Sequence, residues 1–302
     1  MDKKINVGGQ AVIEGVMIRG PGKYMIAVRK KSKIVSKWGK IRKKSALYRL
    51  PLIRGFVNLA EMLAIGIKAL MWSAEQAAPK EEKIGKNEFA ISFLISIGAV
   101  ILIFIALPYF LANLAGFHEE KNPVLFNIVD GIIRISFFLI YIVAISFMKD
   151  VKILFQYHGA EHKAIHCYER GKKLDIGNVS KFTTLHPRCG TSFLLIVFII
   201  SIFVFSLLPS LIMAYYPSFL ELNVWIRRGI LFPVRILLIP IIAGISYEIL
   251  KISDKYQQNF LFRLITLPGL ALQRITTKEP SDKQMEVAIF SLKRLLAIEK
   301  DK

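Results

Sequence analysis

The chain has 302 residues, of which 54% are hydrophobic and 21% are charged, and its formal net charge is +20. This mixture is unusual for a soluble domain and indicates apolar blocks that alternate with charged ones. Two cysteines exclude a disulfide framework and favour reduced thiols. The N-terminus leads directly into a glycine-rich segment, so we expect no cleavable signal peptide.

Residues 1 to 50 predict an N-terminal cytosolic β unit with a basic segment. Residues 7 to 18 are rich in Val, Ile and Met, Gly20-Pro21-Gly22 predicts a turn, and residues 24 to 28 resume a strand pattern. The pattern continues weakly to residue 35. A hairpin or a small sheet is therefore expected near the N-terminus.

An acidic residue and a basic run stand out in this segment. Glu14 lies among apolar neighbours, so its carboxylate is expected to face solvent, to pair with Arg19 or to reach a ligand. Residues 30 to 54 are densely basic with interleaved aromatic side chains. Such a run suits nucleic acid or, beside membrane segments, anionic lipid headgroups.

Residues 51 to 88 predict an amphipathic helix and a linker. Apolar residues recur at helical spacing between residues 52 and 76, but charged or polar side chains interrupt them. We expect this helix to lie at the membrane interface or to pack on the cytosolic part.

Residues 89 to 249 predict a membrane domain of four helices. Each block is long enough to cross a bilayer. The four blocks are residues 89 to 112, 124 to 147, 193 to 215 and 229 to 249.

The basic residues predict the orientation of these spans. Lys and Arg number 19 in residues 1 to 88, 8 in residues 148 to 192 and 10 in residues 250 to 302. Only Lys121 lies between the first two spans. This positive-inside pattern predicts a protein that is integral to the cell (inner) membrane. Both termini and the 148 to 192 connection are then expected in the cytoplasm. Because topology and lipid headgroups account for the basic excess, nucleic acid is not an expected partner.

Two predicted spans contain ionisable side chains. Asp130 and Arg134 are four residues apart in the second span, and Arg235 lies in the fourth. Such groups face a bundle interior and mark either a transport pathway or a structural pair. We favour an Asp130–Arg134 ion pair that pins two helices, with Arg235 extending outward. Four spans without internal repeats are few for a transporter, so a transport pathway is less expected.

Residues 250 to 302 predict C-terminal cytosolic helices. An apolar stretch is expected to break at Pro268-Gly269. A last amphipathic helix runs from about residue 282 to 299, with Ser281 and Gln284 forming a capping-box pattern. Its apolar face needs a partner, for which the β unit or the amphipathic helix is available.

The strongest functional signal is a cluster of histidines. Four of the five histidines and both cysteines lie between residues 158 and 189. If the second span continues as helix into this connection, His158, His162 and Glu169 share one stripe. Glu161 and His166 then lie on its shoulders. Cys167 points the opposite way and is expected to be a packing residue.

Two histidines four residues apart on a helix are a common way to hold a divalent metal, for which zinc is the expected ion. Residues 158 to 162, His-Gly-Ala-Glu-His, also match the H-x-x-E-H pattern of inverted zinc peptidases. In that pattern the glutamate, here Glu161, is the general base.

Three arrangements of this cluster remain open. In the first, His158 and His162 bind the metal with a third ligand and leave one coordination position open for catalysis; the candidates for the third ligand are His166, Glu169, His186 and a distant carboxylate such as Glu14. A closed set of His158, His162, His186 and Cys189 would instead form a structural clip. Without a metal, the side chains would hydrogen-bond along the helix. Arg188 is available to bind an anionic substrate or to pair with Glu161 or Glu169.

Four motifs in order resemble the YqhQ-like family of bacterial membrane proteins of unknown function. They are residues 8 to 17, 158 to 162, 186 to 192 and 279 to 282. Members of that family are described as predicted metal-dependent enzymes. The resemblance implies membrane placement and a site shared by N-terminal, loop and C-terminal segments.

The sequence therefore predicts an α+β integral membrane protein with four transmembrane helices and a cytosolic part made of a small β unit and amphipathic helices. The expected function is metal-dependent hydrolysis or transfer on a membrane-associated substrate. A non-enzymatic scaffold with a structural metal clip, which binds anionic lipid or a protein partner, is the alternative. A small transporter is the third possibility.

Overall fold

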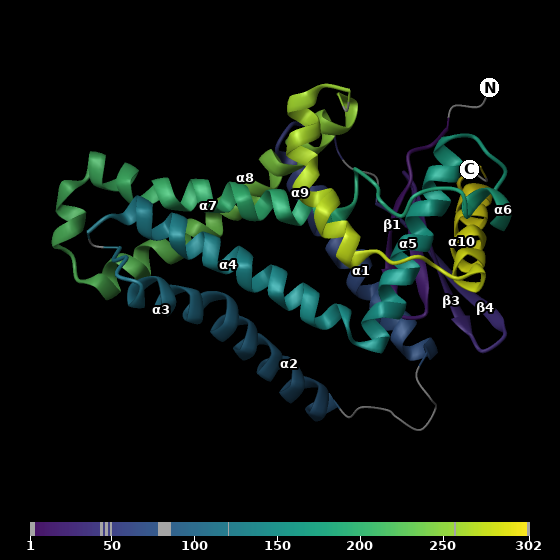
Figure 1. The fold of residues 1–302 in the computed structure, drawn as a ribbon, viewed down its shortest axis with the longest axis horizontal. Helices are drawn as coiled ribbons and strands as arrows, with labels where there is room; N and C mark the ends of the chain where they lie inside the picture. The colour runs from purple at the N-terminus through teal and green to yellow at the C-terminus, as the bar shows by residue number, and fades with distance from the viewer. Residues whose placement is uncertain are drawn as a thin grey trace.

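The computed structural model describes residues 4–42, 45, 48, 50–77, 86–119, 121–256 and 258–300. The fold is α+β, as predicted. A four-stranded sheet lies at one end of the molecule beside helices α5 (Lys149–Glu169), α6 (Ile176–Val179) and α10 (Asp282–Lys300). Long apolar helices extend away from this sheet end (Figure 1).

The sheet is an antiparallel meander in the order β1-β2-β3-β4. Its strands are β1 (Gly8–Val12), β2 (Gly15–Arg19), β3 (Lys23–Lys30) and β4 (Lys33–Lys40). The predicted β unit is thus confirmed, but it extends beyond residue 35 into the basic run. Ile34 and Val35 pair with Arg29 and Val28 of β3, so cross-strand pairing compensates for the lysines of β4. Part of the basic run, including residues 43, 44, 46, 47 and 49, falls outside the described residues.

Helix α10 covers the sheet and α5 with its apolar face. Met285, Leu292 and Leu295 are buried in one core with residues of β2, β3 and α5. The backbone N–H of Ser281 donates to Oε1 of Gln284 over 2.8 Å, which supplies one half of the predicted capping box. The β unit is therefore a partner of this helix, as expected.

Within the described residues, five helices, not four, are long and apolar enough to cross a membrane. The expected number of spans is wrong by one on this criterion. The five segments are Ile53–Ala77 (α1), Ile91–Leu114, Pro123–Ser146 (α4), Gly190–Tyr215 (α7) and Gly229–Ser253. The second comprises most of α2 (Lys86–Ile101), the π-helix η2 (Leu102–Ala106) and α3 (Leu107–Leu114), and the fifth lies within α8 (Val224–Lys255). The short 3-10 helix η3 (Pro217–Glu221) joins α7 to α8.

The additional candidate span is α1, whose charged residues had argued against membrane insertion. Arg54 pairs with Glu248 of α8, and Glu61 pairs with Arg19 of β2, so partners neutralise both charges. The same helix also packs on the sheet, where Ala69 is buried in a core with residues of β1, β2 and β3. The linker of residues 78–85 lies outside the described residues.

Helix α5, which holds the histidine cluster, is not a continuation of the second span. Helix α4 ends at Ser146, and the backbone at Met148 is extended, with φ −70° and ψ 136°. Helix α5 therefore starts in a new direction and runs beside the sheet (Figure 1). The periodicity of the histidines survives because α5 is itself a helix.

The expected break at Pro268-Gly269 is also absent, because α9 (Phe260–Thr276) continues through both residues. A Cβ atom on Gly269 would lie 2.5 Å from Cβ of Ser192 on α7. The glycine is thus required by the close packing of α9 on α7.

Candidate metal centre

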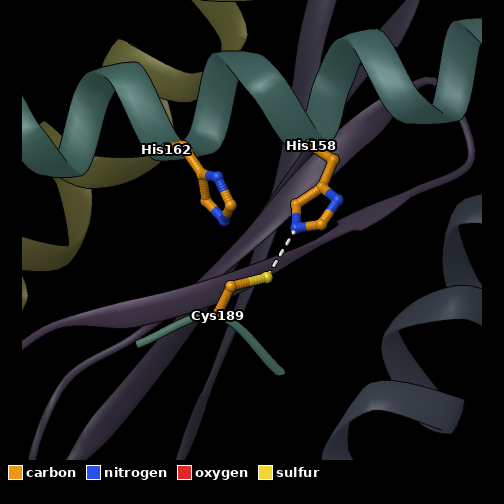
Figure 2. Close-up of side chains that lie close together, drawn as sticks. All are labelled: His158, His162 and Cys189. Atoms are coloured by element: carbon orange, nitrogen blue, oxygen red, sulfur yellow. Dashed lines mark hydrogen bonds between the residues drawn. The ribbon is translucent and has the colours of Figure 1, made fainter. Parts of the chain in front are cut away.

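Three side chains from two elements converge beside α5. His158 and His162 leave the same face of α5, and their rings point toward Cys189, which precedes α7 (Figure 2). The ring centroids of the two histidines are 4.4 Å apart, and Nε2 of His158 lies 3.2 Å from Sγ of Cys189. One ligand atom from each residue lies within 4.8 Å of the others.

Backbone carbonyls orient both imidazoles. Nδ1 of His158 lies 2.9 Å from the carbonyl oxygen of Thr276, and Nδ1 of His162 hydrogen-bonds to that of Thr184. Because each carbonyl requires a donor, Nδ1 carries the proton and the Nε2 lone pair is available to a metal. Burial lowers the pKa of both histidines, which favours the neutral form that binds metals.

The position of Cys189 also suits a metal ligand. It is the N-cap residue of α7, and the amino end of a helix favours negative charge. Its Sγ lies 3.2 Å from Oγ1 of Thr191. Two imidazoles and one thiolate form a donor set that zinc prefers, so the residues present fit this ion.

Glu161 is buried next to this group. Its side chain is almost inaccessible, and its Oε2 lies 3.5 Å from Nε2 of His162. Burial raises the pKa of the carboxyl group. On its other side, Gly9 of β1 approaches so closely that a Cβ atom there would lie 2.7 Å from Oε1 of Glu161. The glycine-rich first strand therefore contributes to the site through the absence of a side chain.

His186 and His166 lie in a second group with Glu169, and not with His158 and His162. Nδ1 of His186 accepts the backbone N–H of Arg188 over 3.2 Å, so Nε2 carries the proton and faces Oε2 of Glu169 at 3.3 Å. The guanidinium of Arg188 pairs with the same carboxylate. Nε2 of His166 donates to the carbonyl oxygen of Leu185 over 2.8 Å, and burial lowers the pKa of His166 to about 4. Hydrogen bonds connect this group, and one ligand atom from each of its three side chains also lies within 4.8 Å of the others, as a metal site would require.

Among the described residues, His186 does not share the 4.8 Å cluster of His158, His162 and Cys189 that the closed set of four ligands would need, although its ring centroid lies 5.6 Å from that of His162. Its position is fixed by Gln273, which is fully buried on α9. Oε1 of Gln273 accepts from the His186 backbone N–H over 2.7 Å, and its Nε2 donates to the His186 carbonyl and to Oγ of Ser192, each over 2.8 Å.

Sequence reasoning missed Gln273 and the role of Gly159. A polar residue within an apolar helix was the only signal for Gln273. A Cβ atom on Gly159 would lie 2.2 Å from the carbonyl oxygen of Lys278, so this glycine lets the segment after α9 pass against α5. That close approach brings the Thr276 carbonyl to His158.

A pocket of about 490 Å³ opens at the three candidate ligands. His158, His162, Cys189 and Glu161 line it together with residues of β1, α1, α5 and α7. Its α1 wall consists of apolar side chains and one glycine. These residues are Leu59, Met62, Leu63, Gly66, Ile67 and Leu70.

Two other predicted residues lie outside this centre. Glu14 occupies the turn between β1 and β2 with a φ of 52°, and Oε2 of its carboxylate accepts from the Tyr157 hydroxyl over 3.3 Å. It neither pairs with Arg19 nor belongs to either cluster of candidate ligands. Cys167 is buried in the core beneath α10, as expected for a packing residue.

The predicted ion pair within the membrane helices is present. Nε of Arg134 donates to Oδ2 of Asp130 over 2.7 Å on α4. Arg235 of α8 joins this polar group instead of extending away from it, because its Nη2 donates to Oδ1 of Asn127 over 3.0 Å and lies 3.9 Å from Oε1 of Glu119. The group links α8 to α4.

Comparisons with known proteins place the chain in a family. The model of the family described as "Protein of unknown function (DUF1385)" matches residues 50–298. The chain is also 33% identical over 309 residues to the "Uncharacterized protein YqhQ" of Bacillus subtilis (strain 168), covering 97% of this chain and 92% of that protein. The chain belongs to this family. The resemblance expected from the four motifs is thereby confirmed, and it assigns no activity. No solved structure matches the chain.

Proposed function

We propose that this protein catalyses metal-dependent hydrolysis or transfer on a membrane-associated substrate, with a divalent metal, expected to be zinc, held by His158, His162 and Cys189. One observation carries the proposal: the three side chains that converge on one point also line a pocket of about 490 Å³. Three protein ligands beside an open pocket match the layout of catalytic zinc sites, which keep one position for water or substrate.

The chemistry divides between the metal and Glu161. A zinc ion supplies a Lewis acid that acidifies water and polarises a carbonyl or phosphoryl group. Glu161 Oε2, 3.5 Å from Nε2 of His162, is placed to accept a proton from the attacking water. Once protonated, the same carboxyl group is placed to return that proton to the leaving group.

The distribution of basic residues supports the orientation. We place both termini, α5 and the sheet on the cytoplasmic side of the cell membrane, because basic residues concentrate in these segments. This orientation requires an even number of crossings. In this proposal α1, which packs on the sheet through Ala69, therefore lies at the interface, although its length and composition would allow it to cross. The candidate centre then lies close to the cytoplasmic surface. Its basic surroundings suit anionic headgroups, and a protein partner has no specific support.

A structural metal clip is the second candidate. Cys189 precedes α7 while His158 and His162 belong to α5, so a metal at this point would tie an apolar helix to the sheet end. A clip normally requires a fourth protein ligand, and His186 does not supply it. The third possibility, a small transporter, is supported only by the Asp130–Arg134 group.

The metal content of the purified full-length protein tests the proposal. We expect about one zinc per chain after purification without chelators, and loss of that zinc in His158→Ala and His162→Ala. His166→Ala is the matched control, since it removes a histidine from the same helix but outside the ligand set, and should retain the metal. A wild-type protein without stoichiometric metal would exclude both metal functions.

Glu161→Gln separates catalysis from a clip. Incubation with a total extract of bacterial membrane lipids, followed by mass spectrometry of the products, should show turnover by the wild type and none by this variant, which retains zinc. Equal product formation by the wild type and Glu161→Gln would refute the assigned role of the glutamate. A zinc-loaded wild type with no turnover would favour the clip.

A further inference from the structure

The pocket at the candidate ligands has an apolar wall that belongs to helices able to cross a membrane. Both α1 and α7 pass the length and composition criterion for spans, and both line the pocket. Leu63 and Ile67 of α1 line it while 55% and 58% exposed, and Leu194 of α7 is similarly open. The apolar surface is therefore continuous from the outer side of these helices to His158 and Cys189. An apolar chain can reach the ligands along this path without crossing water.

A second pocket, of about 410 Å³, adjoins the first, because His186 and Arg188 line both cavities. Its lining is polar and basic. Lys4 and Arg170 contribute two cations beside the Arg188–Glu169 ion pair. Lys4 Nζ donates to the Glu169 carbonyl oxygen over 2.9 Å, which holds the N-terminal segment across the end of α5. This pocket suits an anionic group.

From these two cavities we infer that the substrate is an anionic amphiphilic lipid. Its apolar chain occupies the α1–α7 pocket and its anionic group occupies the basic pocket, so the bonds between them pass His186 and Arg188, which line both cavities and immediately precede Cys189 in the chain. The inference rests on the proposed function for the reaction, but the binding mode requires no metal. The volume of the apolar pocket falls within the range of about 300–1,000 Å³ that ligand sites occupy.

Photocrosslinking in nanodiscs tests this binding mode with full-length protein. The discs contain phosphatidylcholine and a small fraction of phosphatidylglycerol with a diazirine at the end of one acyl chain. The same diazirine on phosphatidylcholine is the neutral comparison. We expect saturable labelling of residues that line the α1 wall, stronger for the anionic probe and displaced by unlabelled phosphatidylglycerol.

Two variants separate the pocket from ordinary contact with bilayer lipid. Ile67→Trp fills the pocket and should reduce this labelling to background. Met71→Trp is its matched control, because Met71 is an apolar residue of α1, 55% exposed, and is not among the lining residues. It should retain the labelling. Uniform labelling of apolar helices that is insensitive to Ile67→Trp would overturn the inference.

The basic pocket is tested by Lys4→Ala and Arg170→Ala. Each should reduce the preference for the anionic probe about fivefold, as expected for one cation near an anionic headgroup. Arg170→Lys should preserve it. Equal labelling by the anionic and neutral lipid probes in the wild type would overturn the inference, even if the labelled acyl chain enters the pocket.

The metal-free His162→Ala variant keeps this test separate from the proposed function. Labelling that persists in this variant supports the binding mode whatever the role of the metal. Conversely, if the wild type binds zinc but its pocket is not labelled, the proposed metal-dependent function stands and the anionic lipid is excluded as its substrate.

Discussion

Gln273→Leu should weaken metal binding although Gln273 touches none of the candidate ligands. The side chain is fully buried and holds both the N–H and the carbonyl of His186, three residues before Cys189. Leucine is of similar size but leaves both backbone groups unpaired. At about 1–3 kcal/mol for each buried unsatisfied group, the local penalty is roughly 2–6 kcal/mol.

Because His186 and Cys189 belong to one short segment, relief of this penalty should displace Cys189 from His158. We expect zinc affinity, measured by competition with a chromogenic chelator, to fall by about 10–100-fold, the usual effect of losing support for a ligand. The thermal unfolding midpoint in detergent should also fall. Gln284→Leu is the control, because Gln284 bonds to Ser281 and to Gln156 of α5 and holds no backbone group of the segment that carries Cys189. It should lower stability without changing zinc affinity. Unchanged affinity in Gln273→Leu would refute the reasoning.

Three further predictions concern packing and thiol chemistry. Gly159→Ala should destabilise the protein and reduce zinc loading, since its Cβ would lie 2.2 Å from the carbonyl oxygen of Lys278; normal zinc content would contradict this. Leu292→Ala should lower the free energy of unfolding by about 2–5 kcal/mol, as for other large core truncations, while zinc per folded chain stays constant. Iodoacetamide should modify Cys189 in metal-stripped protein, as read by peptide mass spectrometry, and zinc should protect it. Cys167 should react only at strongly alkaline pH, because burial raises its pKa and the reactive thiolate forms only as pH rises toward that value.

Features set by local sequence were predictable. Turn glycines and alternating apolar residues indicated the first strands, and helical spacing placed His158 and His162 on one face of α5. These patterns depend on backbone geometry that neighbours in sequence determine. The bend at Met148 did not affect the spacing, because both histidines lie within one helix.

Features set by distant partners were not predictable. Arg54 and Glu61 argued against a span, but Glu248 and Arg19 neutralise them from 194 and 42 residues away in sequence. His186 was expected beside His158, yet a glutamine 87 residues further along the chain fixes its backbone. No local periodicity encodes either relationship.

Glu161 distinguishes the two functions proposed for the metal centre. A carboxyl group that is only 2% exposed, next to imidazoles rather than a guanidinium, is expensive to bury. A structural clip made of His158, His162 and further ligands has no need of it, and an apolar residue would pack there at lower free energy. The fold also places Gly9, with no side chain, against this carboxyl group. A buried acid in the wall of a pocket that the candidate ligands also line is the arrangement that proton transfer requires, so it supports the proposed catalysis over the clip.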